Sequence, residues 1–148
     1  MENQTKPVSF FRFEDLRVYH KSLDYFNWIA EQTKSANNYE LKVVVKPLMN
    51  ASLKISLNIA EGSSRHKVQF VAFLKDAKTA VRECVVIATL ANKIGVFSDE
   101  QFNQSNDTLV EMTKMIGAMI VSLQRNTMRD ENEVKPDFNS STEIEFEY

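Results

Sequence analysis

The side chains that most often carry catalysis or bind metals are scarce in this chain of 148 residues. It has two histidines, His20 and His66, and a single cysteine, Cys84. These three cannot complete a closed four-ligand zinc site, and neither histidine follows a glutamate by three residues, as a di-iron bundle requires. No glycine-rich loop with a lysine is present to hold a nucleotide phosphate. We therefore expect no catalytic residue, no metal, no cofactor and no enzymatic activity.

The cysteine content also indicates where the protein works. Cys84 stands between Val81 and Val85 in an apolar stretch, which is typical of a small core residue whose thiol pKa is raised and whose reactivity is low. A single cysteine cannot form an intramolecular disulfide, which favours a reducing compartment. No segment reads as a signal peptide, and none approaches the roughly 20 apolar residues of a membrane span. We expect a soluble, cytoplasmic protein with no membrane partner.

Basic residues are concentrated between residues 40 and 82, where eight Lys and Arg face Glu40, Glu61 and Asp76, a balance of 8 − 3 = +5. Spacings of three and four residues place three of these cations in one row on the outward face of a helix, which could follow a phosphate backbone. A normally solvated helix exterior would give the same pattern. The candidate nucleic-acid-binding residues are Lys42, Lys46, Lys54, Arg65, Lys67 and the row Lys75, Lys78 and Arg82.

A short motif, NIAEG at residues 58–62, closes a helix that is otherwise mainly apolar. Asn58 and Glu61 are three residues apart and share a side of that helix. We expect Gly62 to take the left-handed conformation that ends a helix, with Asn58 and Glu61 bonding the exposed ends of neighbouring helices. The alternative is a functional surface where the second helix meets the third.

The elements that must position these residues are predicted to be four helices. Three glycines and three prolines leave little turn chemistry for a sheet, and apolar residues recur with the helical period. The first helix starts after FRFEDLRVY, with Glu14 and Asp15 at the positive end of its dipole, and runs to about Ser35. The second covers about residues 40–61, with Pro47 as a kink or as its true start.

The third helix opens at Ser63 or Ser64, whose hydroxyl groups suit a cap, and ends before Gly95. Ser98 and Gln101 form a capping box for the fourth helix, which runs to about Arg125. Four amphipathic helices with short connections predict an all-α fold, an antiparallel up-down-up-down four-helix bundle. Its inward stripes are expected to be Leu16, Tyr19, Leu23, Phe26 and Ala30 on the first helix; Phe70, Phe73, Ala77, Ala80, Val81, Cys84, Ala88 and Ala91 on the third; and Phe102, Leu109, Met112, Ile116, Met119, Ile120 and Leu123 on the fourth.

The second helix is apolar on two opposite sides, whereas one bundle can cover only one of them. A second copy of the chain is the expected cover for the other side, because exposed apolar faces usually mark interaction sites. The alternative is that the first and third helices embrace the second widely enough to cover both sides. One side carries Val44, Leu48, Ala51, Ile55 and Ile59, and the candidate oligomer interface on the other is Met49, Leu53, Leu57 and Ala60.

The chain divides into an N-terminal arm at 1–12, a four-helix bundle at 13–126 and a polar, acidic C-terminal tail at 127–148. Residues 1–126 hold 16 Lys and Arg against 13 Asp and Glu, and the tail holds 2 against 7, so the body is +3 and the tail −5. Such a composition favours a disordered tail. Its closing stretch TEIEFEY alternates apolar and acidic residues, so it could also lie as a strand along a partner surface.

Several motifs resemble a known family, the four-helix-bundle proteins named for the intervening sequences of bacterial 23S ribosomal RNA, to which the accessory variability determinant of diversity-generating retroelements is also similar. The resemblance covers about residues 13–124. The motifs that carry it are Phe13-Glu14-Asp15-Leu16, Asn58-Ile59-Ala60-Glu61-Gly62, Phe70 with Phe73-Leu74, Glu83, and the connection from Gly95 to Glu100.

This resemblance implies an up-down bundle that assembles into a ring, typically a pentamer, with a basic surface able to face RNA and no established enzymatic activity. The chain departs from the family in having Met49-Asn50 where many relatives have paired arginines, which weakens nucleic-acid binding through the second helix. It also has Ser56-Leu57 where relatives have a proline before the asparagine motif, so the helix should be straighter there.

The function predicted from the sequence is that of a non-enzymatic, oligomeric scaffold or adaptor with possible weak RNA or DNA binding through the basic surface of the second and third helices. The alternative is a purely protein-binding oligomer, whose acidic tail docks on a partner or screens the basic face.

Overall fold

The computed structural model describes residues 9–134, and within them every regular element is helical. The prediction of an all-α fold is therefore confirmed for this part of the chain. None of the helices described has the length and apolarity needed to cross a membrane. In chain order the elements are the 3-10 turn η1 (Arg12–Asp15), α1 (Arg17–Gln32), α2 (Asn38–Glu40), the π-helical turn η2 (Leu41–Val45), α3 (Lys46–Ser63), α4 (Lys67–Lys93) and α5 (Asp99–Val134).

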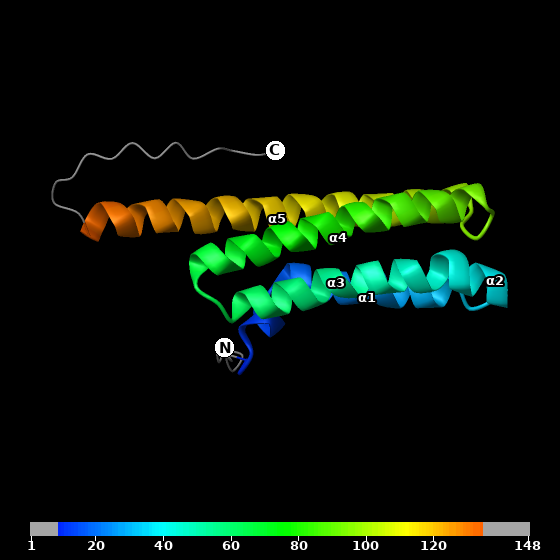
Figure 1. Ribbon diagram of the computed structural model, residues 1–148, viewed down its shortest axis with the longest axis horizontal. Coiled ribbons are helices and arrows are strands. Elements are labelled where there is room, and N and C mark those ends of the chain that lie inside the picture. The colour runs from blue at the N-terminus through cyan, green and yellow to red at the C-terminus, as the bar shows by residue number, and fades with distance from the viewer. Residues whose placement is uncertain (1–8, 135–148) are drawn as a thin grey trace, which may run out of the picture.

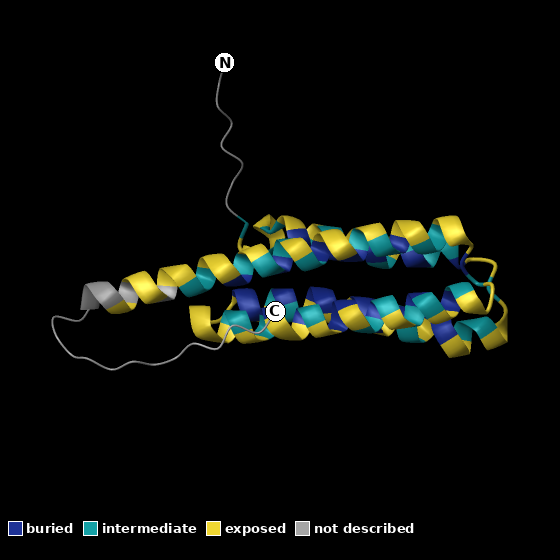
Figure 2. Cartoon of the chain, turned by 90° about the horizontal axis from the view of Figure 1, so that it is seen from above, coloured by how far each residue is buried: buried dark blue, intermediate teal, exposed yellow. Residues whose placement is uncertain are grey.

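The four long helices lie side by side along the length of the molecule (Figure 1). α4 packs against both α3 and α5, and α1 contacts α3 and α5. The connection from α3 to α4 and the end of α5 lie toward one end of the molecule, while α2 and the turn from α4 to α5 lie toward the other (Figure 1). Buried residues line the inner sides of the helices, and exposed residues follow their outer sides (Figure 2).

The buried face of α1 differs from the predicted stripe. Val18, Ser22, Tyr25 and Ile29 are buried, whereas Leu23 is 39% exposed. Two buried polar contacts also lie on this face. The Ser22 hydroxyl lies 2.8 Å from that of Ser56 on α3, and the Tyr25 hydroxyl lies 2.8 Å from that of Ser105 on α5.

Pro47 is accommodated without a break in the chain's helical path. Pro47 is the second residue of α3, but α2, η2 and α3 follow one another with no residue between them and with right-handed helical backbone angles at both junctions, so no free helix start lies at this proline. Pro47 has no N–H group for the carbonyl one turn before it, and the wider turn η2 lies directly before it. The preceding wider turn closes with the Lys46 N–H donating to the Leu41 carbonyl.

The predicted start of the third helix is wrong, because α4 begins at Lys67. The Ser63 and Ser64 hydroxyls instead donate to the Ala60 and Glu61 carbonyls, where they complete the last turn of α3. Their side chains satisfy carbonyls at the end of one helix and leave the next helix to start later.

The turn between α4 and α5 follows the sequence prediction. Gly95 has a φ of +84°, which favours glycine and ends the preceding helix. The Ser98 N–H donates to the Gln101 side chain over 2.9 Å, and the Gln101 N–H donates to the Ser98 hydroxyl over 3.1 Å, so the capping box is confirmed. α5 continues to Val134, beyond the end expected near Arg125.

The predicted strand in TEIEFEY lies outside the described residues, as does most of the N-terminal arm. The boundaries between arm, bundle and tail stay predictions.

Candidate nucleic-acid interface

The eight candidate cations do not form one surface. Lys42 and Lys46 lie toward the end of the molecule that carries α2, while Arg65 and Lys67 lie at the connection from α3 to α4. Lys54 lies midway along α3 and donates to the Glu83 carboxylate over 3.1 Å. Because α3 and α4 are long, these residues are spread over the whole length of the bundle.

Lys54 and Arg65 are already paired within the described chain. Lys54 is neutralised by Glu83, and the Arg65 guanidinium donates twice to one Glu61 oxygen, over 2.6 and 3.0 Å. Arg65 also lies over the Phe73 ring, 5.6 Å from its centroid. A phosphate group would have to compete with these contacts, so Lys54 and Arg65 are the weaker part of the predicted site.

Lys75, Lys78 and Arg82 do form a row on α4, which we call the α4 basic row. Lys75 and Arg82 are exposed, and Lys78 is half-buried. Arg82 donates to the Thr79 hydroxyl over 3.2 Å. Among residues 9–134, no carboxylate forms an ion pair with any of the three. Their charges therefore remain available to an anionic ligand.

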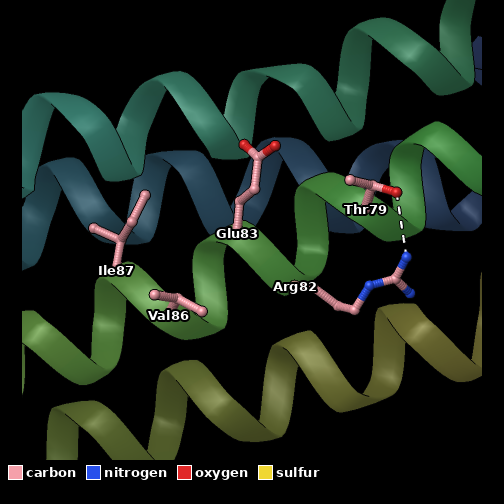
Figure 3. A pocket seen from close by; sticks show the side chains of 5 residues that line it. All are labelled: Thr79, Arg82, Glu83, Val86 and Ile87. Carbon is pink, nitrogen blue, oxygen red and sulfur yellow. Dashed lines mark hydrogen bonds between the residues drawn. The ribbon is translucent and has the colours of Figure 1, made fainter.

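The α4 basic row faces away from α3. Glu83 points toward α3, where it meets Lys54, whereas Arg82 leaves α4 on the side of α5 (Figure 3). At about 100° per residue, Lys75 and Lys78 lie on the same flank as Arg82. The surface predicted between the second and third helices therefore divides into two flanks of α4. The flank facing α3 is paired, and the flank facing α5 carries free cations.

A shallow hollow of about 390 Å³ opens on α4 beside this row (Figure 3). Val86, which is 61% exposed, and Ile87 give it an apolar floor, and Arg82 and Glu83 place opposite charges beside that floor. Thr79 completes the lining. The hollow can hold a flat or apolar group next to a cation.

α5 adds a cation that the sequence analysis missed. Lys114 is exposed and follows Asp99 by 15 residues, while Lys78 precedes Lys93 by 15 residues, so the two lie at about the same level after the turn. No ion pair of Lys114 is found among the described residues. The sequence did carry a signal for the position of Lys114. The capping box and Gly95 fix the turn, and the turn sets which residues of α5 lie beside which residues of α4.

The NIAEG motif joins α3 to α4 through close packing. A Cβ on Gly62 would lie 2.7 Å from the Phe73 Cβ and 2.8 Å from the Phe70 Cδ2. Gly62 is buried within α3, and Gly95 is the glycine with positive φ among the residues described, so the predicted left-handed conformation of Gly62 is wrong. Glycine is required here because the two helices approach too closely for any side chain.

The polar residues of the motif also act differently from the prediction. The Asn58 amide donates to the Lys54 carbonyl over 2.9 Å, and Glu61 binds Arg65, so both satisfy groups of their own segment instead of the ends of neighbouring helices. Ile59 is fully buried, and the Ala60 carbonyl accepts from Ser63. The motif thus serves close packing of α3 against α4, and both of its polar side chains, Asn58 and Glu61, are bonded within the chain.

The candidate oligomer interface on α3 is open in the single chain. Leu53 is 42% and Leu57 57% exposed, so α1 and α4 do not cover this side of the helix. Met49 and Ala60 are half-buried, and Met49 packs against the core.

The N-terminal segment extends the apolar surface near α3, since η1 contacts that helix. Phe10 is 93% and Phe11 52% exposed. Their rings meet edge to face at 5.0 Å, and Phe11 stacks on Phe13 at 5.5 Å. The sequence analysis did not identify these aromatic residues, although the run FFRF was a visible signal of them.

Of the groups suited to acid–base or redox chemistry, Cys84 and Tyr25 are buried and the His20 ring is hydrogen-bonded, whereas His66 is exposed. Burial raises the pKa of the Cys84 thiol to about 12, with the Glu83 charge adding to the effect, so the reactive thiolate is rare at neutral pH. Burial likewise raises the pKa of Tyr25. The His20 ring bonds the Glu14 carbonyl. Among the described residues, no three His, Cys, Asp or Glu side chains gather to hold a metal ion.

Comparison with known proteins matches residues 14–118 to the family described as 23S rRNA-intervening sequence protein. The matched region runs from η1 to the middle of α5 and includes the NIAEG motif, the α4 basic row and the α4–α5 turn. No curated protein matches the chain.

Proposed function

The chain belongs to the family of 23S rRNA-intervening sequence proteins, and we propose that it is a non-enzymatic, self-associating scaffold that binds the phosphate backbone of RNA or DNA through the α4 basic row. This proposal depends on one observation, that the three cations of the row form no ion pair among the described residues. Three cations at spacings of three and four residues, without carboxylate partners in the described chain, match a backbone of regularly placed negative charges.

The setting of the row supports the same function. Lys114 on α5 adds charge at the level of Lys78, and the hollow with Val86 and Ile87 can receive a nucleobase beside Arg82. The other five candidates are a secondary part of the proposal. Lys42 and Lys46 are distant from the row, and Lys54 and Arg65 are paired. Lys67 is closer, because it lies on α4, but it stands at the beginning of that helix. Binding is expected to be weak and independent of sequence, since no side chain is arranged to read base edges.

Fluorescence anisotropy with a labelled single-stranded RNA tests this proposal. The variant K75Q/K78Q/R82Q is expected to bind about tenfold less tightly near 0.1 M salt, and its plot of log K against log salt should be shallower by about 2, at about 0.7 per phosphate contact. The matched control R17Q/K34Q/K93Q removes the same charge at exposed cations outside the eight candidates and should retain both. Equal losses in the two variants would show only a general charge effect and would refute the site.

Self-association is the second part of the proposal and is supported by the exposed leucines of α3 and by Phe10 and Phe11. We propose that the four long helices form an antiparallel up-down-up-down unit and that this unit assembles in the cytoplasm into a ring, a pentamer if it follows its relatives. Light scattering after size exclusion should give a multiple of the 17.0 kDa chain. L57E should shift the protein toward a single chain, whereas V68E, at an exposed valine of α4, should not. A wild-type protein of 17 kDa at micromolar concentration would refute assembly.

A protein-binding role without nucleic acid is the second candidate function. The exposed aromatic residues Phe10 and Phe11 favour it, because such residues are typical anchors of protein interfaces. F10A/F11A should then abolish capture of a partner protein and leave RNA affinity unchanged.

A further inference from the structure

The α4 basic row has an apolar neighbour on α5. Glu111, which pairs with Lys21 of α1 over 2.7 Å, marks the flank of α5 next to α1. Val110, Gly117 and Val121 lie about 80 to 120° around the helix from Glu111, on the flank next to α4. Val110 is 44% and Val121 46% exposed. We call the row together with these three residues the α4–α5 face.

The two halves of this face lie at the same level. α5 turns back along α4 after a short connection (Figure 1). Lys75 precedes Lys93 by 18 residues, and Gly117 follows Asp99 by 18 residues. With equal rise per residue in both helices, Lys75 and Gly117 therefore lie side by side, and Arg82 lies beside Val110.

Gly117 gives the face room for an incoming chain. A Cβ at this position would have nothing within 4 Å among the surrounding groups, and Gly117 does not have positive φ. Neither packing nor backbone conformation within the described chain therefore requires glycine at this point in α5. Glycine in a helix lets another backbone or a ring approach closely.

The segment after α5 has the complementary pattern. Residues 135–148 lie outside the described structure, and their sequence holds Lys135 against Asp137, Glu143, Glu145 and Glu147. Between the last three acids stand Ile144 and Phe146. In an extended chain, alternate side chains point to opposite sides, so the glutamates would share one side and the apolar residues the other.

The segment is long enough to return to the face. Val134 lies 134 − 117 = 17 helical residues beyond Gly117, or about 26 Å at about 1.5 Å per residue. Lys78 is level with residue 114, about 30 Å from Val134. If three residues are spent on turning back, Glu145 reaches about 26 Å and Glu147 about 33 Å at about 3.3 Å per residue.

We propose that residues 143–147 of the same chain occupy the α4–α5 face in an extended conformation, with Glu145 beside Lys75 and Glu147 beside Lys78. Ile144 and Phe146 then lie on the α5 side, on either side of Gly117. Tethering supplies an effective concentration on the order of millimolar, which lets a few exposed ion pairs hold the segment in place. The surface thus fits an acidic, alternating peptide that the chain itself carries.

This occupant competes with nucleic acid. The inference rests on the proposed function only for this consequence, because the segment and a phosphate backbone need the same cations. Neutralising the glutamates should therefore raise RNA affinity, by about three- to tenfold at low salt, where exposed charges are least screened.

Carbodiimide coupling, which joins a carboxylate to a lysine amine without a spacer, tests the contact directly. In the full chain at 50 mM salt, mass spectrometry should find Glu145 coupled to Lys75 and Glu147 to Lys78, with both products reduced at 500 mM salt. A mixture of ¹⁵N-labelled and unlabelled protein should show that both ends come from one chain. Coupling without preference over Lys42 and Lys46, or mainly between chains, would overturn the proposal.

RNA affinity separates this inference from the proposed function. E143Q/E145Q/E147Q should bind RNA more tightly, whereas the control D130N/E131Q/E133Q, with the same change in charge, should bind as the wild type does. Selective coupling without any RNA binding would support the docked segment and refute the proposed function. RNA binding through the row without selective coupling would do the reverse.

Discussion

The two flanks of α4 use similar residues for different purposes. On the flank facing α3, Glu83 pairs with Lys54, and Phe73 packs against Gly62 and under Arg65. On the flank facing α5, Lys78 and Arg82 find no carboxylate among the described residues. Charge on one side of the helix is used to hold the bundle together, and charge on the other side is available for a ligand.

Gly62 on α3 and Gly117 on α5, which face the two flanks of α4, also differ in their surroundings. At Gly62 a Cβ would collide with two phenylalanines, whereas at Gly117 it would meet nothing within 4 Å. The first glycine is therefore required by the fold. The second is required neither by packing nor by backbone conformation within the described chain.

The largest expected effect is that of alkaline pH on the free energy of unfolding, through Cys84 next to the flank of α4 that faces α3. The Cys84 thiol has its pKa raised from the ordinary 9.0 to about 12, so above pH 9 the unfolded chain loses this proton while the folded chain keeps it. Stability is then fully present below pH 9 and falls by up to about 1.4 kcal/mol per pH unit toward pH 12. Urea denaturation at pH 8 to 11 measures it. C84A should flatten the profile between pH 9 and 10, and an unchanged slope there would contradict the assignment to Cys84.

Gly62→Ala should show how tightly the same flank is packed. The added methyl meets the Phe73 Cβ, which cannot move without moving α4, so we expect a loss of about 1 to 3 kcal/mol from the free energy of unfolding. The midpoint of chemical denaturation measures this loss. A variant as stable as the wild type would show that α3 and α4 are less closely packed than described.

Gly117→Ala provides the contrasting change on the α4–α5 face. The methyl has room, and alanine favours the helix over glycine, so we expect a gain of about 0.5 to 1 kcal/mol in the same measurement. The same variant should weaken selective coupling of residues 143–147, because the methyl occupies the space proposed for the returning chain. A loss of stability would mean that groups of the described chain pack more closely on Gly117 than its open surroundings indicate.

The smallest expected difference is between single charges on the two flanks. Lys54→Gln breaks the pair with Glu83, which is partly exposed, and should lower stability by about 0.2 to 1 kcal/mol. Lys78→Gln breaks no ion pair with a described residue and should change stability less than Lys54→Gln does. Thermal unfolding of the two variants in parallel checks the order, and the reverse order would show that the pair of Lys54 with Glu83 does not stabilise the bundle.

Much of the fold could be predicted because its signals are local. The capping box at Ser98 and Gln101, the left-handed Gly95 and the helical periodicity each depend on a few neighbouring residues. The α1 stripe was misplaced, and the buried face includes Ser22, whose hydroxyl meets that of Ser56 on another helix. Hydrogen bonds between distant residues leave no pattern in hydrophobicity.

The candidate site was less predictable than the fold for a similar reason. The row of Lys75, Lys78 and Arg82 follows from spacing along one helix, but spacing does not say which cations have partners. Lys54 and Arg65 look equivalent to the row in the sequence, yet both are paired in the structure. Lys114 could be added only once the turn had set α5 beside α4.

The sequence by itself determined the helical class of the described chain, the turn between α4 and α5, the absence of a second cysteine and the presence of eight cations between residues 40 and 82. These properties depend on residue types and on contacts within a few positions along the chain. Only the tertiary structure decided that Gly62 serves close packing and that α4 has one paired and one unpaired flank. The reason is that pairing and burial arise where helices distant in sequence meet, and the order of the residues alone does not specify those distances.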